Sequence, residues 1–442
     1  SSSGGSVSGS TVTMENRSSQ ASSVTLTGGA SAVFVSGAAG AASNTITLKG
    51  TTLSAEGVSE GGCVYGGITL VRSSEGSVSG SMLTVNTATL KATGGTAIDF
   101  VSSASGAVSN TITLNETNLS AEGVSEDGNV YGGISLVSSA DGSVSGSTLE
   151  INTATLQVTD GASVHFINGA NGVGKYTIGL NGSDISAKGI QTGGSVYGGI
   201  TLVESYNGIV SGSGSKITLS GDGSGNRTSL AATDGASVYF VNGAEGAEGN
   251  TIELNGADIS AKGVQADGRV YGGAITLIGS SDGTVSGSTV NLHSDGSGAG
   301  TTLKATDGAS IHLVSGAKGA EGNAIEINGA AITADGDQAD GVTYGSSSLI
   351  ESLSGTATDN KVYLHSTGSS ITSFQIQDGA DMTLVSGAGG VSGNHVRMSG
   401  AILGVTGGGT LSAVSSSGGT AEGNTVEVLT TDKNDRSKIT AS

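Results

Sequence analysis

The sequence predicts an all-β fold, a single-stranded parallel β-helix solenoid of about 13 rungs, each with about 30–39 residues and three short strands. Three observations predict it. A long phrase recurs at nearly constant spacing, a shorter phrase recurs at about half that spacing, and polar and apolar residues alternate with the period of a β-strand in the copies. No stretch has the period of an amphipathic helix.

The long phrase is Val-Tyr-Gly-Gly. It begins at Val64, Val130, Val196 and Val270, and it decays to Thr343-Tyr344-Gly345. Its tyrosines are 66, 66, 74 and 73 residues apart. Recurrence at such spacing over most of a chain is typical of repeat architectures, in which each repeat packs on its neighbours.

The short phrase is a small turn residue followed by alternating polar and apolar positions, as in Asn44-Thr45-Ile46-Thr47-Leu48. We count 13 copies, spaced 29 to 39 residues apart, so each long repeat contains two of them. The copies begin at Ser10, Asn44, Ser81, Asn110, Ser147, Thr177, Ser215, Asn250, Ser288, Asn323, Asn360, Asn394 and Asn424, and those at Thr177–Leu180 and Ser215–Leu219 are degenerate. The unit of the fold is therefore half the long repeat, in two alternating forms.

Each unit contains about three strand-like segments with a period of two. In the form that begins at Asn44 these are Thr45–Leu48, Thr52–Ala55 and Gly67–Val71. In the form that begins at Ser81 they are Met82–Val85, Thr89–Ala92 and Ala97–Val101. The Val-Tyr-Gly-Gly phrase then marks the start of the third strand. A β-propeller would need longer, aromatic-marked blades, and a calcium-binding roll would need a G-G-x-G-x-D repeat, so both alternatives fail.

Equivalent positions in successive rungs should stack into columns. An interior column is predicted at Phe34, Phe100, Phe166, Phe240, Leu313 and Leu384. The residue before it varies in chemistry, which predicts a solvent column at Val33, Asp99, His165, Tyr239, His312 and Thr383. The recurring Asn that opens many copies suits a turn, where it tolerates left-handed backbone and can bond its copy in the next rung. The recurring Asp-Gly-Ala at Asp160, Asp234, Asp307 and Asp378 predicts a second turn.

Composition limits the class of protein. The 442 residues include 79 Gly and no Pro, which fits repeated tight turns and nearly complete hydrogen-bonded ladders. A net charge of −20 with scattered Lys and Arg argues against nucleic acid as a partner. No segment is apolar for long enough to form a membrane helix, and the lone Cys63 excludes an internal disulfide framework. Residues 1–429 are predicted as the repeat region, with 430–442 as an atypical tail or the lead into a further segment.

No constellation of residues predicts catalysis, a cofactor or a metal site. The histidines are His165, His293, His312, His365 and His395, and their spacing follows the columns, so we interpret them as solvated strand residues. Carboxylates share the outward position of the first strand at Glu150, Glu253, Glu326 and Glu427, with Asn291, Tyr363 and Arg397 between some of them. No carboxylate pair for sugar hydrolysis stands out, and Asp184 and Asp258 recur two rungs apart.

Three further residues stay open as binding candidates. Tyr206, Tyr239 and Tyr363 are predicted to be exposed and could stack on sugars, although isolated surface tyrosines are the commoner explanation. Cys63 is predicted to be exposed and incidental. No ligand-binding set is predicted from these residues.

The Val-Tyr-Gly-Gly phrase with its Ser- or Gly-rich turn and Asn-Thr-Ile-x-Leu resembles a repeat of large autotransporter passengers, over roughly residues 10–430. These are type V secreted surface proteins of Gram-negative bacteria. The resemblance implies a right-handed β-helix, an interior slice of a passenger, and an outer-membrane or cell-surface location. It also implies cell adhesion and virulence as the setting.

The function expected from this resemblance is that of an extracellular adhesin segment or adhesin stalk without enzymatic activity. Its partners would be a host-cell or bacterial surface glycan or protein receptor. The alternative is a structural surface fibre that associates with itself, and a carbohydrate-active β-helix enzyme is the third hypothesis. The segment itself is not expected to enter a membrane.

Overall fold

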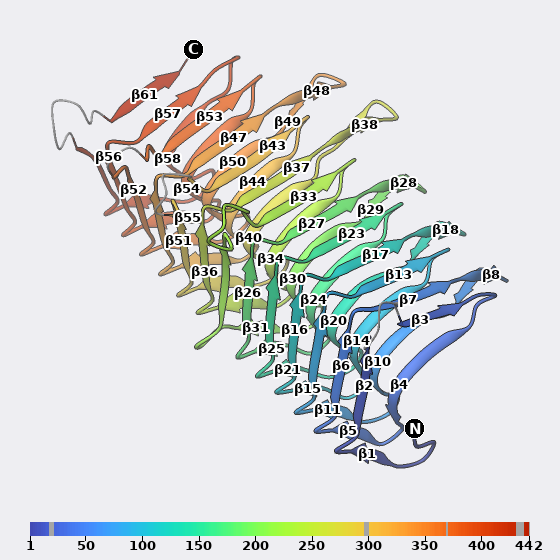
Figure 1. The fold of residues 1–442 in the computed structure, drawn as a ribbon. Helices are drawn as coiled ribbons and strands as arrows, with labels where there is room; N and C mark the ends of the chain where they lie inside the picture. The colour runs from blue at the N-terminus through green and yellow to red at the C-terminus, as the bar shows by residue number, and fades with distance from the viewer. Residues whose placement is uncertain (17–21, 296–299, 368–369, 430–436, 442) are drawn as a thin grey trace. The chain divides into compact units, whose positions relative to one another are not determined.

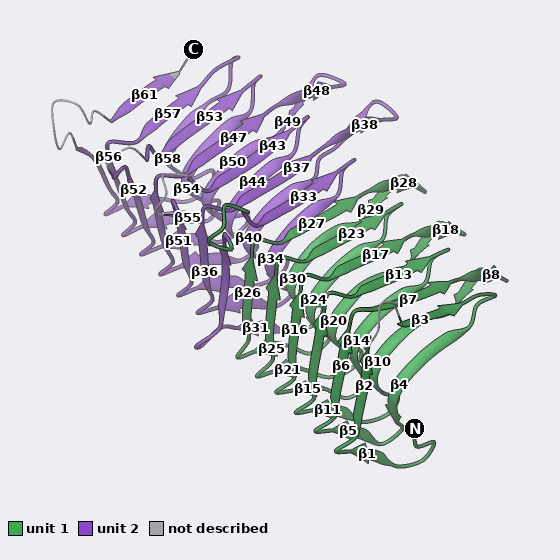
Figure 2. Ribbon diagram, viewed as in Figure 1, with its two compact units in different colours: residues 1–207, 222–226 green, residues 208–221, 227–442 purple. Residues whose placement is uncertain are grey.

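The computed structural model describes residues 1–16, 22–295, 300–367, 370–429 and 437–441. These residues form strands and turns and no helix, so none of them makes a helix that could span a membrane. The chain divides into two compact units (Figure 2). Unit 1 comprises Ser1–Asn207 and Asp222–Asn226, and unit 2 comprises Gly208–Gly221 and Arg227–Ser442.

Within each unit the chain winds repeatedly through four parallel sheets, and each strand pairs with its equivalent in the next turn (Figure 1). We number the sheets by the order in which one rung passes through them. In unit 1 the first sheet contains β2 (Thr11–Glu15), β6 (Thr45–Lys49), β12 (Met82–Asn86), β16 (Thr111–Asn115), β22 (Thr148–Asn152) and β26 (Thr177–Asn181). The second contains β3 (Ser22–Leu26), β7 (Thr51–Glu56), β13 (Thr89–Thr93), β17 (Asn118–Glu122), β23 (Thr155–Thr159) and β27 (Asp184–Lys188). The third contains β4 (Ser31–Gly37), β10 (Gly67–Ser73), β14 (Ala97–Ser103), β20 (Gly133–Ser139), β24 (Ser163–Gly169) and β30 (Gly199–Ser205). The fourth contains β1 (Ser6–Ser8), β5 (Gly40–Ala42), β11 (Ser77–Ser79), β15 (Ala107–Val108), β21 (Val144–Ser145) and β25 (Val173–Gly174).

Unit 2 repeats the same plan. Its first sheet contains β32 (Lys216–Ser220), β36 (Thr251–Asn255), β42 (Thr289–His293), β46 (Ala324–Asn328), β52 (Lys361–His365), β56 (His395–Ser399) and β60 (Thr425–Leu429). The second contains β33 (Ser229–Thr233), β37 (Asp258–Lys262), β43 (Thr302–Thr306), β47 (Ala331–Asp335), β53 (Ser373–Gln377), β57 (Ile402–Val405) and β61 (Lys438–Ala441). The third contains β34 (Ser237–Gly243), β40 (Ala274–Ser280), β44 (Ser310–Gly316), β50 (Ser346–Ser352), β54 (Asp381–Gly387) and β58 (Leu411–Ser415). The fourth contains β31 (Ile209–Ser211), β35 (Gly246–Glu248), β41 (Thr284–Ser286), β45 (Gly319–Glu321), β51 (Thr356–Thr358), β55 (Gly390–Ser392) and β59 (Ala421–Glu422).

The parallel β-helix predicted from the repeats is confirmed. The first-sheet strands, six in unit 1 and seven in unit 2, fall on the 13 copies of the short phrase. A rung has four strands, however, where the sequence predicted three. The fourth is only two or three residues of mostly Gly, Ala, Ser and Val, which is too short to show an alternating pattern and is typical of a turn. Of the predicted tail, residues 430–436 and 442 lie outside the described residues, and β61 pairs in parallel with β57.

The core of each unit is built from the inward residues of the strands. Phe100, Phe166 and Phe240 are fully buried, as the predicted interior column requires, and Phe34 in the first turn of unit 1 is half-buried. The neighbouring column, predicted to be in solvent, is mostly only partly exposed. Two of its members, Asp99 and His165, share a cavity with residues of hairpins that the sequence analysis did not predict.

Short β-hairpins with two-residue turns project from alternate rungs, between the second and third sheets (Figure 1). Unit 1 contains β8–β9 (Val58–Glu60, Cys63–Tyr65), β18–β19 (Val124–Glu126, Asn129–Tyr131) and β28–β29 (Ile190–Thr192, Ser195–Tyr197). Unit 2 contains β38–β39 (Val264–Ala266, Arg269–Tyr271) and β48–β49 (Asp337–Ala339, Val342–Tyr344). Both tip residues have positive φ, for example 50° at Asp127 and 81° at Gly128, which is the type I′ geometry favoured in such hairpins.

The Val-Tyr of the long phrase therefore belongs to a hairpin strand. In the first three copies the second glycine begins the third-sheet strand, whereas in the fourth copy that strand begins at Ala274. A tyrosine on one hairpin can reach the preceding hairpin. The Tyr131 hydroxyl of β18–β19 donates a hydrogen bond of 2.9 Å to the Gly62 carbonyl at the tip of β8–β9. Tyr65, on the first hairpin, is 55% exposed. The phrase thus contributes to holding successive hairpins of unit 1 together.

Rungs without a hairpin have a tight turn at the same corner, and the two forms fit together. At Asp160-Gly161 the backbone turns with φ of 55° and 80°, and the Ala162 N–H donates to the Thr159 carbonyl at 3.2 Å. This confirms the predicted Asp-Gly-Ala turn. The flanking hairpins close on it, because a Cβ at Gly161 would overlap Cγ2 of Ile190 and lie 3.2 Å from Cγ1 of Val130. The two alternating rung forms are therefore complementary parts of one packing arrangement.

The predicted Asn column is a buried hydrogen-bonded ladder in unit 2. The Nδ2 groups of Asn323 and Asn360 donate to Oδ1 of Asn360 and Asn394, at 3.0 and 2.9 Å. The left-handed backbone lies one residue earlier than predicted, for example at Asp359, where φ is 53°. The Asn itself stays extended because its side chain must point inward to bond the next rung.

Candidate functional site

The outward face of the first sheet in unit 2 carries a column of large polar side chains. Parallel register places Glu326, Tyr363, Arg397 and Glu427 side by side on four successive strands. Their inward neighbours, such as Val362 and Leu364, are buried in the core. The outward placement that the sequence predicted for these residues follows directly from this alternation.

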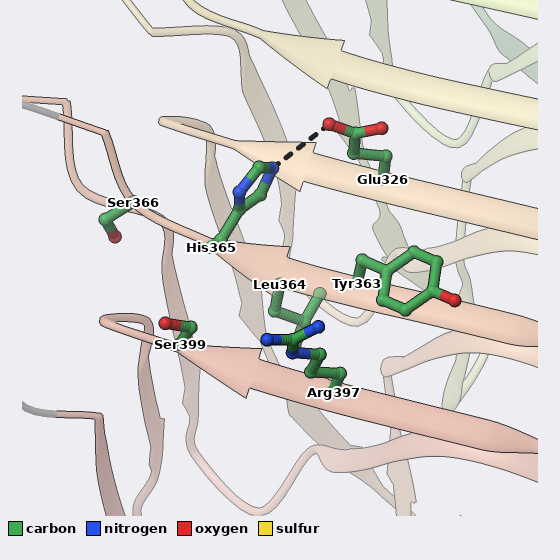
Figure 3. A pocket seen from close by; sticks show the side chains of 7 residues that line it. All are labelled: Glu326, Tyr363, Leu364, His365, Ser366, Arg397 and Ser399. Atoms are coloured by element: carbon green, nitrogen blue, oxygen red, sulfur yellow. Dashed lines mark hydrogen bonds and ion pairs between the residues drawn. The ribbon is translucent and has the colours of Figure 1, made fainter. Parts of the chain in front are cut away.

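A surface pocket of about 490 Å³ opens on this face (Figure 3). Side chains from three adjacent strands and the turns that follow them line it: Glu326, Tyr363, Leu364, His365, Ser366, Arg397 and Ser399. On one side, Nε2 of His365 lies 3.1 Å from Oε1 of Glu326. This contact joins neighbouring strands at their outward surface, so the rim of the pocket is held by side chains as well as by the ladder.

On the other side, His395 orients the aromatic ring of Tyr363. The two rings pack edge to face, with centroids 5.8 Å apart and planes at 85°. His395 Nε2 in turn lies 3.5 Å from Oε2 of Glu427, and Arg397 Nε lies 3.9 Å from the same oxygen. Half of the Arg397 side chain is exposed (51%), so its guanidinium is only loosely held and can turn to a ligand.

The chemistry of this pocket suits recognition of a polar partner. An arginine offers a planar fork of donors, and a tyrosine ring offers an apolar face beside a hydroxyl. Among the residues that the structure describes, no group of three or more His, Cys, Asp or Glu side chains is placed to hold a metal ion. The pocket can therefore offer hydrogen-bond donors and an aromatic ring to a polar ligand.

The other sequence candidates are dispersed over the two units. Glu253 pairs with Lys216 at 2.7 Å, and Asp258 pairs with Arg227 at 3.0 Å, so both have surface partners. Tyr206 is 54% exposed, whereas Tyr239 is only partly exposed on the third sheet. Glu150 and Asp184 lie on separate sheets of unit 1, His293 ends β42, and Cys63 is exposed on the first hairpin.

Four of the five histidines lie beside a glutamate, which the interpretation as solvated strand residues did not anticipate. Besides His365 and His395, Nδ1 of His312 lies 3.1 Å from Oε2 of Glu351, and Nδ1 of His165 lies 3.7 Å from Oε2 of Glu204. Burial alone would raise the pKa of Glu351, but the hydrogen bond and the positive charge available on His312 hold it below its usual value. The two His–Glu pairs on the third sheet were missed because each third-sheet strand has two successive buried residues, such as Leu349 and Ile350. This interrupts the strict alternation of inward and outward side chains from which the pairing would be read.

Two groups on the third sheet of unit 1 have strongly displaced pKa values. Burial raises the pKa of Asp99 to about 6, and the nearby Arg72 charge opposes this only in part. Burial lowers the pKa of His165 to about 4, so the imidazole is neutral at physiological pH and forms no ion pair with Glu204 there. Both lie in the column predicted to face solvent, beneath the hairpins.

We expect Asp99→Asn to stabilise the protein at neutral pH. The folded state raises this pKa above its unfolded value of 3.8. Ionisation of the carboxyl therefore lowers the folding stability of the wild type as the pH rises from about 3.8 through about 6. The variant should gain on the order of 2 kcal/mol above pH 7 and little below pH 4. Thermal unfolding measured from pH 3.5 to 8 checks this. An equal gain at pH 4 and pH 8 would contradict it.

No family model matches the chain, and no curated protein matches it. Among solved structures, a similar one is described as "Crystal structure of TibC-catalyzed hyper-glycosylated TibA55-350 fragment", with 16% sequence identity and a TM-score of 0.25, covering 98% of this chain and 99% of that one.

Proposed function

We propose that the chain is a β-helical segment of a Gram-negative bacterial surface protein of the autotransporter passenger kind. In this proposal it acts outside the cell, as a non-catalytic adhesin segment that attaches to a surface glycan. What supports the location and the kind of protein is the repeat phrase, set in a rigid fold of complementary rungs. The segment holds its binding residues on strands rather than on mobile loops.

The observation that carries attachment is the pocket in Figure 3, where Tyr363, Arg397, His365 and Glu326 gather on one outward face. On the equivalent face of unit 1 the matching positions are mostly threonines, for example Thr47 and Thr113. Small side chains at these positions in unit 1 are thus replaced in unit 2 by large polar ones, which can contact a ligand. Glycans offer the hydroxyls and apolar ring faces that such side chains recognise.

We expect Arg397→Ala combined with Tyr363→Ala to weaken binding of the isolated chain to a glycan array or to host cells by at least about tenfold, the effect of losing interface anchors. The matched control is Thr113→Ala, in the same column of unit 1, which should bind as the wild type does. Binding that the double variant leaves unchanged would remove this pocket from the proposal. Binding to cells stripped of glycans would indicate a protein receptor instead.

The second candidate is a structural surface fibre or stalk. The observation in its favour is the fit of hairpins onto the glycine turns between them, as at Gly161, which stiffens the stack of rungs. It would be preferred if the chain bound no glycan or cell surface yet formed filaments in electron micrographs. Release of reducing sugar from polysaccharides would instead favour an enzyme.

A further inference from the structure

A second cavity, distinct from the pocket in Figure 3, lies on the third sheet of unit 1. It has a volume of about 310 Å³, and its floor is formed by Asp99, Ser135 and His165, which register places on three adjacent strands. Its walls come from the hairpin residues Val130 and Tyr197. The hairpins therefore convert a flat sheet face into a groove.

The floor of this groove is rich in hydrogen-bond acceptors. Asp99 contributes a carboxyl group that is only partly exposed, so it gains more from a donor than a fully exposed carboxylate would. Nδ1 of His165 is buried, with no hydrogen-bond partner among the described residues, and Oε2 of Glu204 lies 3.7 Å from it. In either tautomer the neutral imidazole ring keeps one nitrogen that can accept a hydrogen bond.

The spacing of these acceptors defines the size of the ligand. Asp99 and His165 are two rungs apart, about 10 Å by the separation of paired strands. Ser135 lies between them and can donate or accept. A ligand that meets all three must be extended, must carry donors along its length, and must offer an apolar surface to Val130 and the Tyr197 ring.

We propose that this groove binds a short saccharide that carries free amino groups, with an ammonium at Asp99 and a hydroxyl or amine donor at His165. The net charge of −20 disfavours anionic sugars and favours cationic ones. The groove is formed by unit 1 alone and does not depend on the pocket proposed for attachment.

The test is calorimetric titration of the whole chain with a glucosamine disaccharide, its N-acetylated counterpart and a uronic acid disaccharide. Saturable binding of the amine-bearing sugar is expected, with at least a tenfold loss of affinity in Asp99→Asn and a several-fold loss in His165→Gln. The control Glu150→Gln changes an outward carboxylate on the first sheet of unit 1 and should leave the affinity unchanged.

A measurement on the wild type keeps the proposal testable if a variant does not fold. With five histidines in the chain, imidazole NMR signals can be followed individually, and the His165 signal should shift on titration with the amine-bearing sugar. The proposal is overturned if none of the three sugars binds, if the uronic acid binds best, or if Asp99→Asn binds as tightly as the wild type. Loss of attachment in the Arg397 and Tyr363 variants would leave this titration unchanged, so the two proposals fail separately.

Discussion

Gly161→Val is expected to destabilise unit 1 by about 3 kcal/mol or more, through backbone strain and overpacking together. Gly161 has a φ of 80°, a conformation that a β-branched residue strongly resists. It also lies between two hairpins, where any Cβ would overlap Ile190 and press on Val130. Relief of either contact would require the hairpins to move apart.

Thermal or denaturant unfolding followed by circular dichroism measures this effect. The matched control is Gly179→Ala, since Gly179 lies in strand β26 of the same unit with open space where its Cβ would be and without a positive φ. The control should change the free energy of unfolding by less than about 1 kcal/mol. If Gly161→Val lowered the free energy of unfolding by no more than Gly179→Ala, the close fit between hairpins and turns would be disproved.

Asn360→Ala is expected to cost about 3–5 kcal/mol in unit 2, because it leaves several buried polar groups without partners at about 1–3 kcal/mol each. The Asn360 Oδ1 accepts from the backbone N–H and the Nδ2 of Asn323, at 2.9 and 3.0 Å. Its own Nδ2 donates to the Ala320 carbonyl at 2.8 Å and to Asn394 Oδ1 at 2.9 Å. The side chain is fully buried, so water cannot replace these bonds.

Urea unfolding of Asn360→Ala beside Asn328→Ala isolates the role of the ladder. Asn328 is a partly exposed asparagine at the end of β46 in the same unit, and its Oδ1 accepts a bond from the exposed Thr367 hydroxyl. Its replacement should cost less than about 1 kcal/mol. Equal losses for the two variants would mean that the buried ladder contributes nothing special to the stacking of rungs.

The repeats were sufficient to predict the stacking of rungs, because each column repeats one physical requirement. The buried Phe100 and Phe166 and the turn at Asp160-Gly161 each recur at equivalent positions, so their roles could be inferred by comparison. The hairpins were missed although a signal was present. Two-residue Gly-Gly or Asp-Gly pairs, such as Asp127-Gly128, stand between short alternating segments, and this is a strong hairpin pattern.

The candidate sites could be predicted only in part. Alternation placed Glu326, Tyr363 and Arg397 outward on one face, but it could not indicate that His395 would pack against the Tyr363 ring. The groove above Asp99 and His165 was not foreseeable from periodicity. It exists because hairpins from neighbouring rungs overhang the sheet, a tertiary relation that no local pattern records.

The stacking of hairpins on alternate rungs can be tested with one distance. Spin labels on the natural Cys63 and on Ser195→Cys occupy equivalent positions on the first and third hairpins of unit 1. Four rungs separate them, so a pulsed electron resonance measurement should give a narrow distribution centred near about 19 Å, broadened by the label arms. A broad distribution, or one centred beyond about 30 Å, would contradict the parallel rung stacking on which both proposed sites depend.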